Sequence, residues 1–317
     1  MFKKVIVFIF FLTIGLVYLH NLTRDIYSGD VGDLVTAAVV HGVPHPTGYP
    51  LFTLLGFILS KIPLLIPPVT KVGLISVFAS LVGLFILYKY SFKITKSIFL
   101  SLLTVSILAF SYLFWLHSEL PEVFALNNFF VILILYFAIR FHENGKLKDL
   151  YILTFLVFLS LTHHHTILLL FPSVGFIVLT KLPLLFKNKT TIPKLLIITI
   201  VGLLPYIYVP IAAFTNPVIN WDNVVNLNNF ISLILRQDYG GFAPSVMNGV
   251  PFIVKSIVAR DFLKTIVSLY SYQIVFVAVL GALSLFKKDK FLLFEINSYT
   301  GPSPAMIVVE FTLFEIL

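Results

Sequence analysis

The stretch VGLISVFASLVGLFILYKY, residues 72–90, decides the fold of this chain. It carries a single charge, Lys89, and approaches the roughly 20 apolar residues that a helix needs to cross a bilayer. Similar runs recur along the sequence, since 59% of the 317 residues are apolar and only 11% are charged. An ordinary soluble domain has about 25% charged residues, so this composition excludes that class. The sequence therefore predicts an all-α polytopic membrane protein.

Working outward from residues 72–90, we predict eight spans with both ends of the chain inside. The first follows Lys3–Lys4 and has no small-residue cleavage site behind it, so we interpret it as an uncleaved span. Residues 49–60 are interpreted as a short helix on the outer surface, because a span there would move the lysines between 89 and 96 outside, against the positive-inside rule. The predicted spans are 5–19, 72–90, 97–116, 122–140, 149–162, 166–186, 193–213 and 264–286.

The charge distribution agrees with this arrangement. Of the 22 Lys and Arg residues, fifteen fall inside and seven outside, so membrane orientation accounts for the net charge of +8 and no nucleic-acid partner is expected. The sequence contains no cysteine, which excludes disulfides, thiolate catalysis and Cys-ligated metals. We assign residues 1–290 to a single transmembrane domain and give the tail 291–317 no function.

Polar side chains gather at the predicted outer ends of the spans. A charge at the centre of a span costs about 2.5 to 3.5 kcal/mol, and the mid-span positions are nearly free of charge. Segments far apart in the sequence therefore deliver their functional groups to one end of the bundle, where we expect the site. The residues concerned are Asp30, Asp33, His45, Glu119, Glu122, His163, His164, His165, Trp221, Asp222, Arg236 and Asp238.

Two interpretations fit the acidic pair Asp30 and Asp33. An apolar run follows them and stops at Gly42, so Asp30 is expected at the N-cap of a helix and Asp33 at its third position. A carboxylate at a helix N-terminus is also kept ionised, as a general base requires. If the pair is catalytic, Asn at either position should reduce activity with little change in stability.

Two further clusters of polar residues can each be interpreted in two ways. Glu119 and Glu122 flank Pro121, and their spacing predicts one helical face, with helix capping as the alternative to substrate binding. The run His163–His165 invites a metal, but consecutive side chains on a helix diverge by about 100°, and the sequence holds no metalloprotease pattern. We therefore predict no metal site there.

Arg236 lies on the amphipathic stretch 230–239 of a predicted outer loop. Its planar fork suits a lipid phosphate at headgroup level, and a snorkelling surface arginine is the alternative. Tyr112, Trp115 and Trp221 are interpreted as aromatic residues of the membrane interface rather than as substrate-stacking groups.

Motifs in the first outer loop resemble a known family. DVGD at 30–33 and HGVPHPTGYPLF at 41–52 are similar to the pattern Asp-Ser-Gly-Glu and His-Pro-Pro-Gly-Tyr-Pro-Leu of the protein O-mannosyltransferase-like family of transmembrane protein 260 and its prokaryotic relatives. EVFALN at 122–127, LTHHHT at 161–166, NWD at 220–222 and RQDYG at 236–240 add to the resemblance. The chain departs from the pattern at Asp33, Thr47 and Asp222.

The resemblance implies a GT-C membrane glycosyltransferase that moves a sugar from a polyprenyl-phosphate carrier to a hydroxyl acceptor, protein or glycan, at the outer or lumenal face. It implies Asp30 or Asp33 as the catalytic base, with Asp30 preferred. No cofactor is expected, and a divalent metal is left open. The residues expected to bind the substrate or donor are His45, Tyr49, Glu119, Glu122, His163, His164, His165, Trp221, Asp222, Arg236 and Tyr239.

Two other classes of protein were weighed against this one. A transporter would carry charges along its spans and often two related halves, which this sequence lacks. A catalytically inactive or assembly-only relative is the second alternative.

Overall fold

The computed structural model describes residues 2–241 and, between 251 and 265, residues 251, 253, 254, 256, 257, 260, 261, 264 and 265. Within this part of the chain all regular elements are helical, apart from an isolated parallel bridge between Val43 and Asn220. The predicted all-α fold class is confirmed.

Four helices in the described part are long and apolar enough to cross a membrane. They are α1 (Phe2–Asn21), α4 (Pro68–Thr95), α7 (Val123–Asn144) and the run Thr191–Phe214, which comprises α11 (Thr191–Leu203), η2 (Leu204–Ile207) and α12 (Tyr208–Phe214). The pair α5 (Ile98–Ala109) and α6 (Tyr112–Ser118) would add a fifth, but these two helices meet at a bend of 73°. The chain is therefore an integral membrane protein, and the predicted span 97–116 corresponds to these two helices with a bend between them.

The other predicted spans are shorter or broken. Residues 149–162 correspond to α8 (Leu147–Leu161), and residues 166–186 are divided among η1 (His165–Leu170), α9 (Phe171–Thr180) and α10 (Leu182–Phe186). Pro183 explains the break before α10, because its ring removes a backbone N–H and clashes with the preceding turn. The predicted span 264–286, except its first two residues, and the tail 291–317 lie outside the described residues, so the eight-span count stays a prediction.

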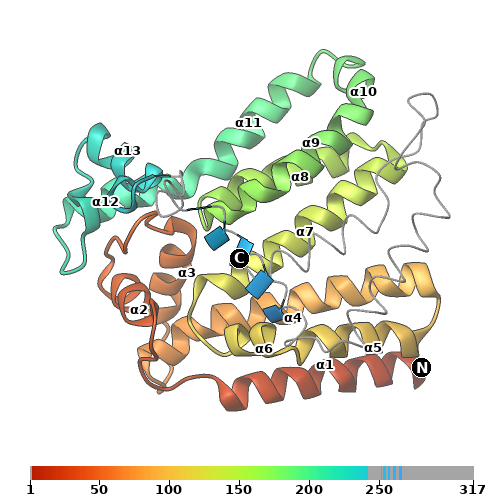
Figure 1. Ribbon diagram of the computed structural model, residues 1–317, viewed down its shortest axis with the longest axis horizontal. Coiled ribbons are helices and arrows are strands. Elements are labelled where there is room, and N and C mark those ends of the chain that lie inside the picture. Colours follow the sequence, from red (N-terminus) through yellow and green to blue (C-terminus); the bar gives the residue numbers. More distant parts are fainter. Residues whose placement is uncertain are drawn as a thin grey trace.

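Three short helices lie at one end of the bundle. They are α2 (Val31–Val40), α3 (Pro50–Ser60), which confirms the predicted short helix, and α13 (Leu227–Leu235). In Figure 1 they lie near α12, whereas α10 and the N-terminus are at the opposite end. Gly, Pro and polar residues interrupt the apolar runs here, so the chain turns repeatedly instead of crossing.

Two apolar clusters hold the long helices together. The larger one is built around α4, α7 and α8 and includes the fully buried side chains of Phe52, Ile134 and Leu153. The smaller one joins α1 to α4, α5 and α6, where the Tyr18 hydroxyl donates to the Ala109 carbonyl over 2.6 Å. This packing fixes α7, whose N-terminus carries Glu122 toward the short helices.

Candidate active site

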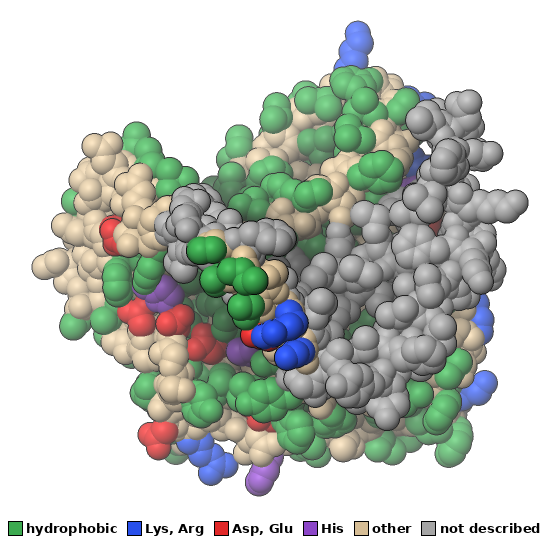
Figure 2. All heavy atoms as spheres, in the orientation of Figure 1, with side chains coloured by type: hydrophobic (Ala, Val, Ile, Leu, Met, Phe, Trp, Pro, Cys, Tyr) green, Lys and Arg blue, Asp and Glu red, His purple; other side chains and the backbone are tan. Residues whose placement is uncertain are grey.

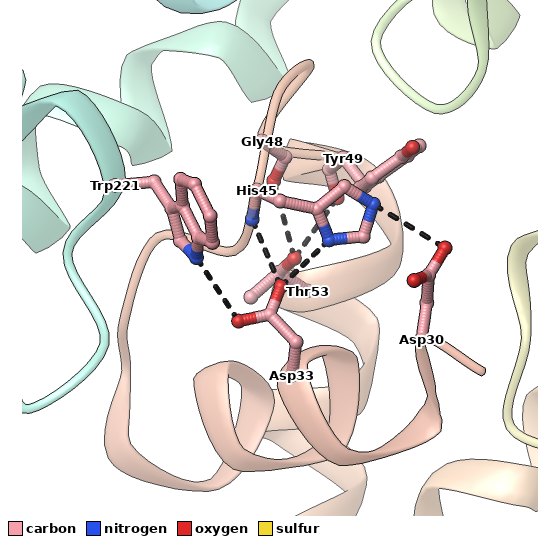
Figure 3. A network of polar contacts seen from close by, with 7 residues as sticks. All are labelled: Asp30, Asp33, His45, Gly48, Tyr49, Thr53 and Trp221. Atoms are coloured by element: carbon pink, nitrogen blue, oxygen red, sulfur yellow. Dashed lines mark hydrogen bonds and ion pairs between the residues drawn. The ribbon is translucent and has the colours of Figure 1, made fainter. Parts of the chain in front are cut away.

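Asp33 is the centre of a polar network at the start of α2. Its Oδ2 accepts from the His45 backbone N–H at 2.9 Å and from His45 Nδ1 at 2.7 Å, and its Oδ1 accepts from the Trp221 indole N–H at 3.1 Å (Figure 3). Asp30 occupies the predicted N-cap position, but its side chain makes no capping hydrogen bond. Helix capping by the Asp30 carboxylate, one of the two interpretations of the pair, is therefore wrong.

Backbone pairing brings Trp221 to Asp33 across 188 residues of sequence. Val43 N–H donates to the Ile219 carbonyl at 2.9 Å, and Trp221 N–H donates to the Val43 carbonyl at 3.1 Å. Gly42 permits this approach, because a Cβ at that position would lie well inside contact distance of the Ile219 carbonyl oxygen. Trp221 is therefore a hydrogen-bond donor of the network, a role that its interpretation as an interface aromatic did not include.

A second contact holds the same loop against α13. Gly48 has φ +78°, and a Cβ there would meet the Leu233 side chain at 2.8 Å. Both its backbone conformation and the close packing require glycine at this position. Val43, Tyr208, Val224 and Leu233 form a small apolar cluster beneath the loop, so α12 and α13 carry the second half of the site to the first.

His45 lies between two carboxylates. Nδ1 donates to Asp33, and Nε2 is 3.5 Å from Asp30 Oδ2. The His45 side chain is 11% exposed and that of Asp33 23%, whereas Asp30 is 61% exposed. Burial raises the pKa of Asp33, but the hydrogen bonds from His45 and Trp221 outweigh it and hold that pKa below its ordinary value. Asp33 is thus kept as an anion that orients His45, and Asp30 remains open to a substrate.

Tyr49 packs against the imidazole of His45. Their ring centroids are 5.1 Å apart in an edge-type contact, and the Tyr49 ring also stacks on His164 at 5.8 Å. Tyr49 precedes α3 with φ 38°, a left-handed conformation that is uncommon for an aromatic residue. Burial raises the pKa of its hydroxyl, so Tyr49 is a neutral wall of the site.

Glu122 adds a third carboxyl group beside Asp30. The residue is only 5% exposed, and its Oε2 has no hydrogen-bond partner in the described part of the chain. Burial, followed by the negative charge of Asp30, raises its pKa to about 7, although the backbone N–H groups of Asp30 and Val123 face it. Glu122 can therefore exchange a proton near neutral pH.

Glu119 does not share a helical face with Glu122, so that prediction is wrong. α6 ends at Ser118, Glu119 is its C-cap residue, and α7 begins only at Val123. Pro121 lies in the turn between the two helices rather than in the first turn of one. The Glu119 carboxylate accepts from Trp115 Nε1 and from Asn21, which directs it away from the Asp33 network.

The three consecutive histidines point to different partners. Nε2 of His163 donates to the Val123 carbonyl at 2.8 Å, Nδ1 of His164 is 2.6 Å from the Thr166 hydroxyl, and Nε2 of His165 is 2.9 Å from the Tyr206 hydroxyl. His163 and His164 lie in the turn after α8, and His165 is the first residue of η1. Among the described residues, no group of three or more His, Asp or Glu side chains is arranged to hold a metal ion.

Burial keeps these histidines neutral. It lowers the pKa of His163 to about 4, that of His165 to about 4 and that of His164 to about 3, with Arg236 contributing to the last two. A neutral imidazole can hydrogen-bond to a sugar or a phosphate but adds no positive charge.

Arg236 is the cation among the predicted site residues. It caps the C-terminus of α13, and its guanidinium carbon lies 5.4 Å from the centre of the Tyr239 ring. Its Nε has no partner in the part of the chain that the structure describes. Burial, followed by the charge of Asp30, raises the pKa of Tyr239, which indicates that this segment faces the acidic pair. Asp222 turns instead toward Asp238, and burial together with that second carboxylate raises its pKa.

Two residues near the site escaped the sequence analysis. The Tyr206 hydroxyl donates to the Leu161 carbonyl at 2.8 Å and meets His165, and Asn127 Nδ2 donates to Thr166 at 3.2 Å. Asn127 is buried, and its Oδ1 lacks a partner in the described structure. A polar side chain inside an apolar run was the available signal for both. Figure 2 shows acidic and histidine side chains gathered toward the end of the molecule where α2, α3 and α13 lie.

Comparison with known proteins agrees with the motifs of the first outer loop. Residues 30–184 match the family described as Protein O-mannosyl-transferase TMEM260 N-terminal domain. Over this region the chain is similar to the TMEM260 family. The chain is 31% identical over 291 residues to Protein O-mannosyl-transferase TMEM260 of Mus musculus, an alignment that covers 88% of this chain and 40% of the relative.

A second relative carries the same family name. The Dictyostelium discoideum protein, Protein O-mannosyl-transferase tmem260, is 29% identical over 260 residues, covering 75% of this chain and 31% of its own length. The chain thus spans two fifths or less of these relatives. No solved structure matches it significantly.

Proposed function

We propose that this protein is an O-mannosyltransferase that transfers mannose from a polyprenyl-phosphate carrier to a protein hydroxyl at the outer or lumenal face of the membrane. The mannosyl group and the protein acceptor come from the names of its relatives. The observation that carries the proposal is the pair of carboxylates around His45, in which Asp33 is occupied by three donors and Asp30 is open.

The proposed reaction needs one base and no protein acid. The acceptor oxygen bonds to C1 of the mannose, the bond from C1 to the phosphate oxygen breaks, and the acceptor proton passes to Asp30. A lipid phosphate leaves already charged, so the second carboxylic acid that a glycoside hydrolase uses to protonate its leaving group is unnecessary. His45 positions Asp30 and is itself positioned by Asp33.

Arg236 is the proposed contact for the donor phosphate. The three buried histidines are neutral, so they cannot compensate the charge that develops on the leaving phosphate. Nε of Arg236 has no partner among the described residues and leaves a donor for an anion, and the guanidinium fork can bind two phosphate oxygens. His164 and Tyr49, whose rings stack on each other, would face the sugar.

The short helices supply a route for the lipid chain. α3 is apolar and exposes Ile58, and α13 exposes Leu227, Ile231 and Leu235. Such helices lie in the interface with their apolar faces toward lipid. A carrier in the membrane could therefore present its phosphate to Arg236 without leaving the bilayer.

The proposal is tested with purified protein, radiolabelled polyprenyl-phosphate mannose and a Ser/Thr-rich peptide. Label should pass to the peptide with the wild type and fall about 10² to 10⁴-fold with Asp30→Asn, the usual range for a general base. A matched control is Asp25→Asn, which removes an acid from the same outer segment outside the network. Equal transfer by the wild type and Asp30→Asn would refute the assignment.

A further inference from the structure

A pocket lies at the end of the bundle opposite to the acidic site. Its volume is about 710 Å³, and it is lined by Gly145, Leu147, Leu184, Lys187, Asn188 and Lys189. The turn from α7 to α8 forms one side, and α10 with the turn that follows it forms the other. In Figure 1 α10 lies at the far end of the molecule from α2 and α13.

Helix length separates the two sites by about one membrane thickness. Glu122 precedes α7 and Gly145 follows it, with 22 residues between them. At 1.5 Å per residue the helix is about 33 Å long, close to the roughly 30 Å of a hydrocarbon core. The pocket therefore faces the headgroups of the leaflet opposite to the one that faces Asp30.

The lining combines unpaired positive charge with apolar surface. Lys187 and Lys189 have no carboxylate partner within the described residues. Leu147 and Leu184 supply the apolar part of the wall. An inorganic anion would use only the lysines, whereas a phospholipid would place its phosphate on them and its glycerol and first methylenes on the leucines.

Two acids at this end, within the part of the chain that the structure describes, are paired with other cations. Glu143 pairs with Lys93, and the buried Asp149 binds Arg140 over 2.9 Å. Neither of these two carboxylates therefore competes with an incoming anion for the lysines of the pocket. Four further lysines of the adjoining turns and helix ends strengthen the local positive potential, namely Lys146, Lys148, Lys181 and Lys194.

We propose that this pocket binds the headgroup of an anionic phospholipid from the leaflet opposite to the candidate active site. Basic pockets between membrane helices have this chemistry, and each lysine near the surface contributes to it. The proposal does not depend on mannosyl transfer, because it concerns other residues at the other end of α7.

Native mass spectrometry of the full chain in detergent can test it. Phosphatidylglycerol and phosphatidylcholine are titrated separately onto the wild type, K187Q/K189Q and K3Q/K4Q. The control pair removes the same charge from α1, also on the predicted inner side, but does not line the pocket. Phosphatidylglycerol should bind the wild type and K3Q/K4Q alike and K187Q/K189Q roughly 30-fold more weakly, and phosphatidylcholine should not distinguish them.

Three outcomes would overturn the proposal. They are unchanged phosphatidylglycerol binding by K187Q/K189Q, an equal loss in K3Q/K4Q, and displacement of the lipid by an equal concentration of inorganic phosphate. Melting temperatures check that each variant is folded. K187R/K189R preserves the charge and should retain binding, so its failure would also refute a charge-based site.

Discussion

Replacing Asp30 and Asp33 separately by Asn should have different consequences. Asp33 receives two donors from His45 on Oδ2 and one from Trp221 on Oδ1. An Asn side chain offers one acceptor oxygen and one NH₂ donor. In the less damaging orientation its oxygen keeps the two His45 donors, and its NH₂ group faces the Trp221 indole N–H.

The size of the loss follows from these bonds. Asp33→Asn removes one hydrogen bond to a charged group, about 1.5 to 3 kcal/mol, and makes two others neutral, which roughly halves their strength. We expect a total loss of about 2 to 4 kcal/mol. Asp30→Asn changes an exposed, isosteric side chain with no capping bond, so its effect should stay within about 0.5 kcal/mol. The structure thus corrects the sequence-based expectation that both variants keep wild-type stability.

Thermal unfolding in detergent and transfer per folded molecule separate these effects. Asp33→Asn should melt lower and lose transfer, whereas Asp30→Asn should melt with the wild type and lose transfer alone. Because the folded-state pKa of Asp33 lies below its unfolded value of about 3.9, its stabilisation is complete above that pH and is lost as the pH falls through the folded pKa. The melting difference should therefore be constant from about pH 8 to 5. Wild-type melting of Asp33→Asn, or near-normal transfer by Asp30→Asn, would refute the reasoning.

Three further predictions concern other parts of the molecule. The pKa of Glu122 is about 7 in the folded protein against an ordinary 4.5, so ionising Glu122 costs the folded state more and more stability as the pH rises between these values. Glu122→Gln should therefore be about 3 kcal/mol more stable than the wild type at pH 8 but no more stable at pH 4, as measured by thermal unfolding. Arg236→Lys should raise the KM for the donor and leave the KM for the peptide unchanged, because a point charge replaces a fork; a normal donor KM would remove it from the phosphate site. A cysteine at exposed Asn228 should react with an impermeant maleimide added outside, and one at Asn144 only after permeabilisation, whereas external labelling at both would contradict the predicted topology.

Sequence patterns correctly predicted the helices whose position depends on neighbouring residues. The apolar run 72–90 lies within α4, residues 50–60 form α3, and Asp30 is the N-cap residue of α2. In each case apolar length, proline position or a capping residue acts over a few neighbours. The prediction that Pro121 lies in the first turn of a helix was wrong, because it used only the local preference of proline for that position. In the structure α7 begins at Val123, two residues later.

The contacts of the site could not be predicted in this way. Trp221 reaches Asp33 only because Gly42 lets residue 43 pair with residues 219 and 221, and no pattern within either segment specifies the other. The identity of the site residues could be inferred from their shared position at the ends of spans. The different roles of these residues could be assigned only from their hydrogen bonds in the structure.

These roles follow from how burial and donors combine at three carboxyl groups. Asp33 is largely buried but satisfied by three donors, so it remains an anion and serves to orient His45. Glu122 is more deeply buried, with one oxygen unpartnered in the described structure, so its pKa is raised to about 7 and it exchanges a proton near neutral pH. Asp30 is exposed, and its nearest partner is the imidazole at 3.5 Å. When similar groups are placed in different environments, their acid and base roles separate. A protonated Glu122 adds no negative charge beside Asp30, and in the proposed reaction Asp30 is then the carboxylate that receives the proton of the acceptor hydroxyl.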